Sequence, residues 1–544
     1  MSVFELEELR VGFATGRDVT EVVHGVSLAV DEGRTLAVVG ESGSGKSVSL
    51  LAAARLLPER ARVSGSARYA GRELVGLPEA RLRSVRGRDI GFVFQEPLTS
   101  LHPLKSIGQQ VGEAISSHER IGSRALRDRV VELLEEVGIR EASSRLHEPP
   151  ARFSGGQRQR IGIASAIAMR PGLLIADEPT TALDVTVQAS ILDLLRTLQR
   201  EHGTAIVFVS HDLAVVSDFA DDVVVMRGGH VIEQGPLTRV VDDPQHPYTA
   251  ELLAAAEHRL PVPPPDGVIS ETPLAELRGV RKTFTARVRG RSRARTVLHD
   301  IDIRVRTGEI LGLVGESGSG KSTIGRTLSG AIRIEAGEVR VSGAVVNAPG
   351  RGRVRLTPEQ RVRVQTIFQD PFGSLNPRRP IADILAEPLR VHRRRSERDI
   401  PAAVADLLDA VRLPRSFAGR YPAQLSGGQR QRVAIARALA LDPALLIADE
   451  PVSALDVTTQ RQIVELLQDL RLSRGISILF ISHDLGIVAE LCDRVVVLSE
   501  GRVVESGPTA DVFRNPAAEY TRTLVAAIPG RGLSAVARAE EVPA

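Results

Sequence analysis

Cysteine, lysine and long apolar runs are nearly missing from this chain of 544 residues. The single cysteine, Cys492, excludes a disulfide framework, a cysteine zinc site and an iron–sulfur cluster. No run of about 18 or more apolar residues occurs, so no segment is expected to span a bilayer. The first ten residues include three glutamates and lack the basic and then apolar order of a signal peptide. These absences predict a soluble, cytoplasmic protein.

Charge is nearly balanced, with 70 basic and 67 acidic residues and a net charge of +3. Arginine supplies almost all of the positive charge, because the only lysines are Lys46, Lys105, Lys282 and Lys321. Lys46 and Lys321 lie in glycine-rich loops, which marks them as lysines with a specific role. A chain of this length is expected to form more than one domain.

The first of these loops, Gly40–Ser47, matches the phosphate-binding pattern G-x-x-x-x-G-K-[ST]. An apolar run (35–39) precedes it and a helix-like run (50–57) follows it, as the pattern requires. Backbone N–H groups at such a turn bind phosphate oxygens, while the lysine reaches the β- and γ-phosphates and the serine holds Mg²⁺. We therefore predict that nucleotide is bound by Gly40, Ser42, Gly43, Gly45, Lys46, Ser47 and Val48.

The chain contains an internal repeat, in which one domain is duplicated in tandem. The same eight letters return at Gly315–Ser322, and every other signal described below recurs at nearly the same interval. A proline-rich stretch, 260–267, lies between the copies and favours an extended spacer. We predict a first domain at 1–260, a linker at 261–272 and a second domain at 273–544. The second loop adds these predicted nucleotide contacts: Gly315, Ser317, Gly318, Gly320, Lys321, Ser322 and Thr323.

Polar residues end three predicted strands of the first copy. Gln95 follows the apolar run 90–94, Asp177 and Glu178 follow 173–176, and His211 follows 205–209. Ligands bind at the rim where such strand ends meet in a doubly wound sheet. Adjacent carboxylates at this rim are costly without a nearby cation.

We therefore predict that Asp177 and Gln95 join Ser47 around Mg²⁺ and that Glu178 polarises an attacking water, with His211 also catalytic. A solvated surface histidine is the alternative for His211. The second copy repeats these roles at Gln369, Asp449, Glu450, His483 and Ser322.

A further helix is predicted to begin at Ser154, with the letters SGGQ, and the same letters recur at Ser426. Simple N-capping by serine is the alternative to a functional role. A helix N-terminus also attracts anions, and the recurrence favours that role. The predicted contacts are Ser154, Gly155, Gly156, Gln157, Ser426, Gly427, Gly428 and Gln429.

Two smaller features complete the predicted domain. Phe13 and its counterpart Phe284 lie where an aromatic ring could stack on adenine, although a partly buried sheet aromatic is the alternative. Residues 103–152 contain apolar residues at helical spacing, which predicts a helical subdomain inserted into the sheet domain.

Together these motifs resemble the nucleotide-binding domains of ATP-binding-cassette (ABC) proteins over nearly the whole chain. By this resemblance the two loops are Walker A motifs, the Asp-Glu pairs end Walker B motifs, and SGGQ is the ABC signature. Gln95 and Gln369 match the Q-loop glutamine, and His211 and His483 match the switch histidine. Phe153 stands where the signature usually has leucine, as at Leu425, and little effect is expected.

The resemblance implies an α/β fold with two P-loop NTPase (ABC-type) nucleotide-binding domains. Each would have a RecA-like mixed sheet core, an antiparallel β subdomain and an inserted α-helical subdomain. The two domains are expected to close head to tail as an intramolecular dimer, with each ATP between one phosphate loop and the other domain's signature helix. Such a tether raises the effective concentration of one half near the other.

Finer features are similar to those of oligopeptide, dipeptide and nickel importers. They are the segments 95–103 and 369–377 and the tail His246–Thr249, of which Tyr520 and Thr521 are kept in the second copy. The resemblance implies a fused pair of importer ATPases at the cytoplasmic face of the cell membrane, powering the uptake of di- or oligopeptides. The implied partners are two integral-membrane permease subunits and an extracytoplasmic substrate-binding protein. Nickel and glutathione are the alternative cargoes.

Other tandem ABC proteins give rival hypotheses. A soluble ATPase acting on ribosomes or DNA is disfavoured by the short proline-rich linker and the single cysteine, and an exporter by segments 95–103 and 369–377. Arginine-rich stretches at 287–295 and 393–395 have no interleaved aromatic residue. We therefore expect solvated arginines and no nucleic-acid partner, with contact to a membrane surface as the alternative.

Overall fold

The computed structural model describes residues 2–16, 18–95, 100–181, 183–256, 269–288, 291–349, 357–453 and 455–530. Most of the predicted linker and residues 96–99 of the predicted importer-like segment lie outside the described residues, as do residues 289–290 of the first arginine-rich stretch. The second half begins with β11 at Ser270, and the domain boundaries remain a prediction.

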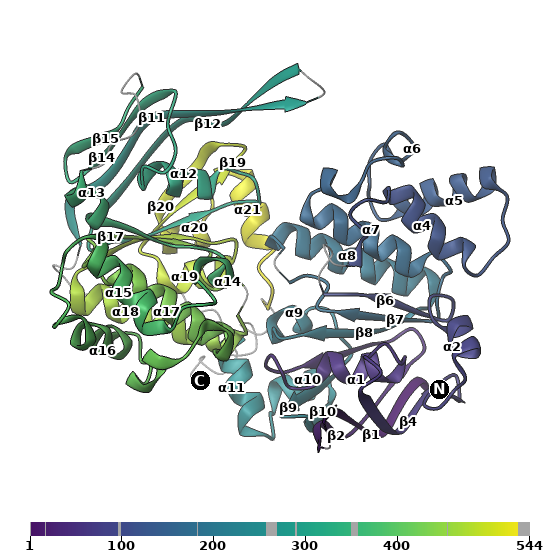
Figure 1. Ribbon diagram of the computed structural model, residues 1–544. Coiled ribbons are helices and arrows are strands. Elements are labelled where there is room, and N and C mark those ends of the chain that lie inside the picture. Colours follow the sequence, from purple (N-terminus) through teal and green to yellow (C-terminus); the bar gives the residue numbers. More distant parts are fainter. Residues whose placement is uncertain are drawn as a thin grey trace, which may run out of the picture.

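Two halves of the same architecture lie side by side (Figure 1). Each contains a four-stranded antiparallel sheet and a six-stranded sheet whose strands are parallel apart from the last pair at one edge. In the first half the antiparallel sheet is β2-β1-β4-β5 and the mixed sheet is β10-β9-β3-β8-β7-β6. Their bounds are β1 Ser2–Thr15, β2 Asp18–Asp31, β3 Thr35–Val39, β4 Ala61–Tyr69, β5 Arg72–Glu73, β6 Ile90–Val93, β7 Leu173–Asp177, β8 Ala205–Ser210, β9 Asp222–Arg227 and β10 His230–Pro236.

The second half repeats these sheets as β12-β11-β14-β15 and β16-β17-β18-β13-β19-β20. The bounds are β11 Ser270–Val288, β12 Arg291–Thr307, β13 Ile310–Val314, β14 Ala336–Val341, β15 Ala344–Asn347, β16 Val364–Ile367, β17 Leu445–Asp449, β18 Ser477–Ile481, β19 Arg494–Ser499 and β20 Arg502–Pro508. Strands β3 and β13 are buried along their whole length, which explains why both read as unbroken apolar runs.

Helices cover the sheets and form the predicted insertion. The first half has α1 Lys46–Ala53, α2 Glu79–Val85, α4 Ile107–Ser116, α5 Ser123–Glu136, α6 Ala142–Arg145, α7 Gly155–Ile167, α8 Val185–His202, α9 Leu213–Ser217, α10 Leu237–Asp242 and α11 Pro247–Ala256. The second half has α12 Lys321–Leu328, α13 Pro358–Arg363, α14 Pro371–Ser374, α15 Ile381–Val391, α16 Ile400–Ala410, α17 Gly427–Leu439, α18 Val457–Arg474, α19 Leu485–Leu491, α20 Thr509–Arg514 and α21 Glu519–Ala526. Helices α4 to α6 lie within residues 103–152, the region predicted as a helical subdomain, which confirms that prediction.

The bounds of some elements, and the position of Phe153, can now be compared with the sequence. Strands β1 and β2 form a long antiparallel pair at the start of the chain. The helix after the phosphate loop begins at Lys46 itself rather than at Leu50. Phe153 and Leu425 are both buried, so phenylalanine takes the same core position as leucine. The Arg145 guanidinium lies 4.1 Å from the centroid of the Phe153 ring.

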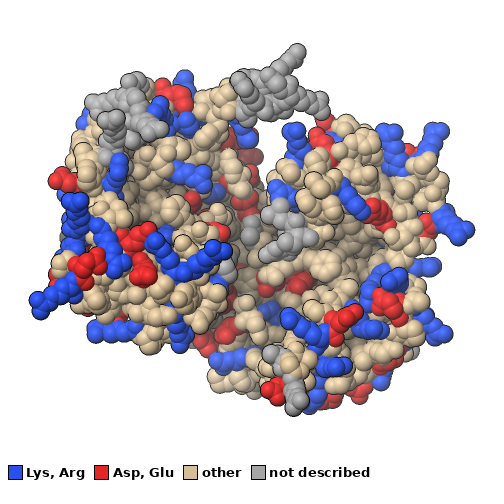
Figure 2. Space-filling view, in the orientation of Figure 1, with Lys and Arg blue, Asp and Glu red and all other residues tan. Residues whose placement is uncertain are grey.

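The halves touch through side chains of both cores. Val185, at the start of α8, belongs to the same buried apolar cluster as residues of the second half. Helix α11 packs on α18, and α21 packs on α8. Among the described residues, none of the helices is long and apolar enough to cross a membrane. Basic and acidic side chains are interspersed on the face shown in Figure 2, without a large patch of one sign.

One ion pair is present in both halves with its charges reversed. In the first half, Arg34 before β3 lies 3.3 Å from Asp222 on β9, and both side chains are partly exposed. In the second half, Glu309 before β13 lies 2.9 Å from Arg494 on β19, and the Glu309 side chain is fully buried. Glu309 also accepts a hydrogen bond from the Arg306 backbone amide. The two pairs therefore differ in environment although they occupy equivalent positions.

This difference gives a matched pair of variants. Arg494→Ala should destabilise the second half by about 3 kcal/mol or more, because it leaves a buried carboxylate without its ion partner. Asp222→Ala, at the equivalent but more exposed position, should cost less than about 1 kcal/mol. Hydrogen-exchange mass spectrometry can report the opening free energy of each half separately. Equal losses in the two halves would contradict the role assigned to burial.

Candidate functional site

Each phosphate loop joins a buried strand to a helix through glycines that no other residue could replace without strain. Gly40 has φ 149°, and a Cβ built there would lie 2.1 Å from the carbonyl oxygen of Met226. Gly45, at the N-cap of α1, has φ 97°. Gly315 and Gly320 repeat these conformations, with φ 145° and 109°. The backbone therefore curls tightly at the helix N-terminus, where amide groups attract phosphate.

Lys46 and Lys321 are buried beneath these loops. The Lys46 ammonium donates to the carbonyls of Gly40 and Glu41 at 2.7 and 2.8 Å. The Lys321 ammonium makes the same bonds to Gly315 and Glu316 at 2.6 and 2.9 Å. Burial lowers the pKa of both lysines, against nearby carboxylates that raise it. Each ammonium is held where a polyphosphate in the loop would meet it.

A serine hydroxyl and a carboxylate meet beside each lysine. Ser47 Oγ donates to Asp177 Oδ1 at 2.7 Å, and Ser322 Oγ donates to Asp449 Oδ1 at 2.9 Å. Burial raises the pKa of Asp177 and Asp449, and the serine hydrogen bond opposes this rise. Hydroxyl and carboxylate oxygens suit Mg²⁺, which is usually held by one or two protein groups together with substrate phosphates and water. The donor set therefore fits the predicted metal.

Glu178 is the centre of a second cluster. Its Oε2 accepts hydrogen bonds from Gln95 Nε2 at 2.8 Å and Thr181 Oγ1 at 2.9 Å, and lies 3.3 Å from His211 Nδ1. Glu178 has φ 45°, a left-handed conformation that is uncommon for a residue with a side chain. Glu450 repeats this conformation with φ 49°, and its Oε2 lies 2.7 Å from Gln369 Nε2 and 3.4 Å from His483 Nδ1.

Burial alone would raise the pKa of the Glu178 carboxyl. The hydrogen bond and charge of His211, the Thr181 hydroxyl and the Lys46 charge outweigh burial and lower this pKa to about 2. Burial would likewise lower the pKa of His211, but the bond and charge of Glu178 raise it instead. The pKa values of Glu450 and His483 shift in the same directions, and at Glu450 a hydrogen bond from Gln369 stands in place of the hydroxyl bond. Each carboxylate is ionised near neutral pH and can polarise a water molecule.

The predicted residues are thus brought together in two groups in each half. The phosphate-loop residues, the serine–aspartate pair, the glutamine, the glutamate and the histidine meet at the carboxyl ends of the parallel strands. Ser154 and Ser426 cap α7 and α17, each accepting from the backbone amide of the glutamine three residues later. Phe13 lies partly buried on β1, and Phe284 is 44 % exposed on β11, with the Lys282 ammonium 5.0 Å from its ring centroid.

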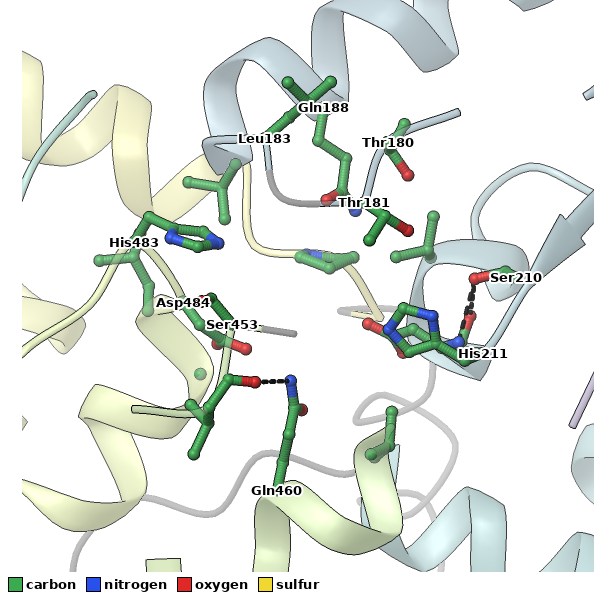
Figure 3. A pocket seen from close by; sticks show the side chains of 18 of the residues that line it. Thr180, Thr181, Leu183, Gln188, Ser210, His211, Ser453, Gln460, His483 and Asp484 are labelled. Carbon is green, nitrogen blue, oxygen red and sulfur yellow. Dashed lines mark hydrogen bonds between the residues drawn. The ribbon is translucent and has the colours of Figure 1, made fainter. Parts of the chain in front are cut away.

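A cleft between the halves is lined by equivalent residues from both. It contains His211 and His483, Ser210 and Ser482, and Gln188 and Gln460. Figure 3 shows the two histidines on opposite sides of the cleft, carried by opposite halves. Thr186 Oγ1, near the start of α8, donates to Glu316 Oε1 in the second phosphate loop at 3.3 Å. The start of the long helix in one half therefore reaches the phosphate loop of the other.

Sequence reasoning missed two kinds of residue at the site. Asp184 is among the charges that raise the pKa of Lys321 against burial, and Asp456 acts in the same way on Lys46. Tyr248 and Tyr520 accept hydrogen bonds from the phosphate-loop amides of Glu41 and Glu316. Their recurrence at equal intervals was a signal, but the sequence alone did not show what they contact.

The comparisons with known proteins agree with this geometry. The ABC transporter family model matches residues 23–181 and 298–453, and the model of the oligopeptide/dipeptide transporter C-terminal region matches residues 232–265 and 504–540. The chain belongs to the ABC transporter family and carries two tandem ATP-binding domains. It is an ATPase whose ATP hydrolysis is coupled to transport through membrane permease partners.

The chain is similar to two curated proteins over nearly all of its length and to a solved structure over part of it. The peptidoglycan transport ATP-binding protein YejF of Agrobacterium fabrum is 45% identical over 535 residues, covering 96% of both chains. The glutathione import ATP-binding protein GsiA of Escherichia coli K12 is 41% identical over 561 residues, covering 97% of this chain and 90% of that one. A solved structure of the ATP-binding cassette MJ0796 bound to ADP and Pi is 30% identical and covers 43% of this chain and 98% of its own, with a TM-score of 0.39.

The Glu178–His211 contact makes a pH prediction. In wild type the carboxylate raises the pKa of His211, so the imidazolium persists to higher pH than an isolated buried histidine would allow. Glu178→Gln removes the negative charge and leaves the burial, so the pKa of His211 should fall below its usual value near 6.5. NMR titration of labelled histidine, with His211→Ala to assign the resonance, measures this change.

Glu136→Gln is the matched control, because Glu136 contacts His202 rather than His211. This control should leave the titration of His211 unchanged. A His211 titration that is the same in wild type and in Glu178→Gln would contradict the contact.

Proposed function

We propose that this chain is the ATP-hydrolysing component of an importer of di- or oligopeptides. The observation that carries the proposal is the match of both halves to the oligopeptide/dipeptide transporter C-terminal region, in addition to the ABC transporter match. The similarity to proteins named for peptidoglycan transport and glutathione import supports cargo that contains peptide bonds. Glutathione, a small peptide, is the second candidate cargo and is favoured by the similarity to GsiA.

In this proposal each half binds ATP through its phosphate loop. Lys46 and Lys321 bind the β- and γ-phosphates, and Ser47 with Asp177, and Ser322 with Asp449, hold Mg²⁺, with Gln95 and Gln369 nearby. When bound, Mg²⁺ neutralises charge on the phosphates. Glu178 and Glu450 polarise the attacking water, and His211 and His483 hold these carboxylates in position through the contacts described above.

The opposite half completes each site. The signature residues Ser154–Gln157 are proposed to face the second phosphate loop and Ser426–Gln429 the first, where a helix N-terminus can stabilise charge on the γ-phosphate. The contact of Thr186 with Glu316 supports an arrangement in which the halves meet across their phosphate loops. We also propose domains at 1–260 and 273–544, a location on the cytoplasmic face of the membrane, and a separate extracytoplasmic protein that selects the cargo.

Removing both proposed general bases tests the chemistry. Glu178→Gln with Glu450→Gln should keep ATP binding and lose roughly 10²-fold or more of the turnover, the usual scale for a lost general base. ATP hydrolysis and equilibrium binding of a fluorescent ATP analogue measure the two quantities. Glu132→Gln with Glu359→Gln, at two exposed positions, is the matched control and should hydrolyse ATP at the wild-type rate. Wild-type turnover by the first double variant would exclude both carboxylates from the mechanism.

Uptake by cells tests the cargo. Cells with the gene should accumulate labelled di- and tripeptides, and cells that lack it or express only the Glu178→Gln, Glu450→Gln protein should not. Labelled glutathione and nickel are measured in parallel. Accumulation of nickel alone, or uptake of every compound independent of the gene, would overturn the peptide proposal.

A further inference from the structure

Each half ends in a helix that packs on its own domain and also on a helix of the other half. We call α11 the first arm and α21 with residues 527–530 the second arm. The first arm packs on α18, and Arg461 Nη1 of α18 donates to the carbonyl oxygen of Ala254 at 2.7 Å. The second arm packs on α8, and the Gly530 amide donates to Asp218 Oδ2 at 2.9 Å. Figure 1 shows both arms at the boundary between the halves.

A tyrosine near the start of each arm reaches the phosphate loop of its own half. Tyr248 Oη accepts a hydrogen bond from the Glu41 amide at 3.0 Å, and Tyr520 Oη accepts one from the Glu316 amide at 3.1 Å. Tyr248 is only 1% exposed, and the Arg227 guanidinium lies 4.5 Å from its ring centroid. The same contact is made independently in both halves, although the residues around the two tyrosines differ.

The turn before each arm is anchored to the edge strand of its own sheet. Glu233 on β10 accepts hydrogen bonds from the amides of Gln245 and His246 at 2.9 and 3.1 Å. Glu505 on β20 accepts from the amides of Ala517 and Ala518 at 2.8 and 3.0 Å. The tyrosine hydroxyls are therefore held in place by backbone that is itself fixed.

The amide that the tyrosine contacts belongs to the same peptide group as a carbonyl that holds the lysine. Glu41 N and Gly40 O lie on one planar peptide unit. Tyr248 binds its amide side, and the Lys46 ammonium binds its carbonyl side at 2.7 Å. The Gly315–Glu316 peptide is held in the same way between Tyr520 and Lys321. Rotation of this peptide unit would break both bonds, so each hydroxyl fixes the direction in which the lysine is held.

The helix of the second half on which the first arm packs begins beside a carboxylate that acts on Lys46. Helix α18, on which the arm packs, begins after Asp456, whose carboxylate accepts from the Thr459 amide. Asp456 is among the carboxylates whose charge acts on Lys46. Tyr248 and Lys46 thus bind the same peptide of the phosphate loop. The carboxylate of Asp456, at the start of α18 in the other half, also acts to raise the pKa of Lys46 against the effect of burial.

We propose that Tyr248 and Tyr520 are positioning residues for ATP binding, each orienting the first peptide of its phosphate loop according to how its arm is seated on the opposite half. The inference rests on the proposed ATP sites and is independent of the cargo. The hydroxyls touch the loop and not the reacting atoms, so they set affinity for ATP and leave the chemical step to Glu178 and Glu450.

Removing the hydroxyls while keeping the rings tests this role. Tyr248→Phe with Tyr520→Phe should raise both the Kd and the KM for ATP roughly fivefold, the scale of one lost hydrogen bond, and leave kcat within about twofold. Tyr421→Phe, at a tyrosine that is 44% exposed, is the matched control and should change neither constant. If the hydroxyls only stabilised the fold, the variants would have a lower Tm but would not combine a raised KM with an unchanged kcat. Unchanged Kd and KM, with or without a lower Tm, would overturn the proposal.

Loosening the seat of the first arm tests the link between halves. Arg461→Ala should raise the Kd for ATP, and adding it to Tyr248→Phe should produce no further rise, because both changes act on one route. An unchanged Kd, or increments that add fully, would overturn that link. A wild-type protein that binds no ATP would overturn both this inference and the proposed sites, whereas ATP binding without peptide uptake would overturn only the cargo.

Discussion

The structure depends on a buried ammonium group that two carbonyls of each phosphate loop hold in place. A lysine is costly to bury without polar partners, and here the partners are the loop's own backbone together with carboxylates at the ends of neighbouring strands. The loop can supply its carbonyls only if it curls tightly, which requires glycine at Gly40 and Gly315. The parallel strands then bring the serine–aspartate pair and the glutamate to the same rim. The burial of the lysine ammonium group therefore determines the conformation of the loop and the position of the catalytic residues at the sheet edge.

The sequence predicted the fold, and it predicted which polar residues lie together at the strand ends, because its signals are local. Strand, turn and helix follow one another around Lys46, and the residues that end β7 and β8 lie at the rim where parallel strands meet. Duplication strengthened every one of these signals by presenting it twice. The family comparisons confirm the ABC class and the tandem arrangement, and the sheets and helical insertion have the expected order.

Contacts between the halves could not be predicted in the same way. Val185 packs into the core of the other half and Thr186 reaches Glu316, yet both look like ordinary first-turn residues of α8. From the sequence, Tyr248 and Tyr520 are only part of a tail segment that is similar to that of importer ATPases. Their hydrogen bonds to backbone amides leave no pattern in the sequence, because any residue other than proline offers the same N–H group. Such contacts depend on how elements distant in the chain are placed, and periodicity carries no information about that.

The reversed ion pairs have a consequence for how a duplicated chain assembles. Two copies with similar strands can exchange them while folding, a characteristic failure of repeated domains. If β3 of the first copy paired with β19 of the second, Arg34 would meet Arg494, and if β13 paired with β9, Glu309 would meet Asp222. Each wrong pairing brings like charges together, while each correct pairing joins opposite charges. The inverted polarity of these two pairs therefore disfavours the exchanged strand pairings.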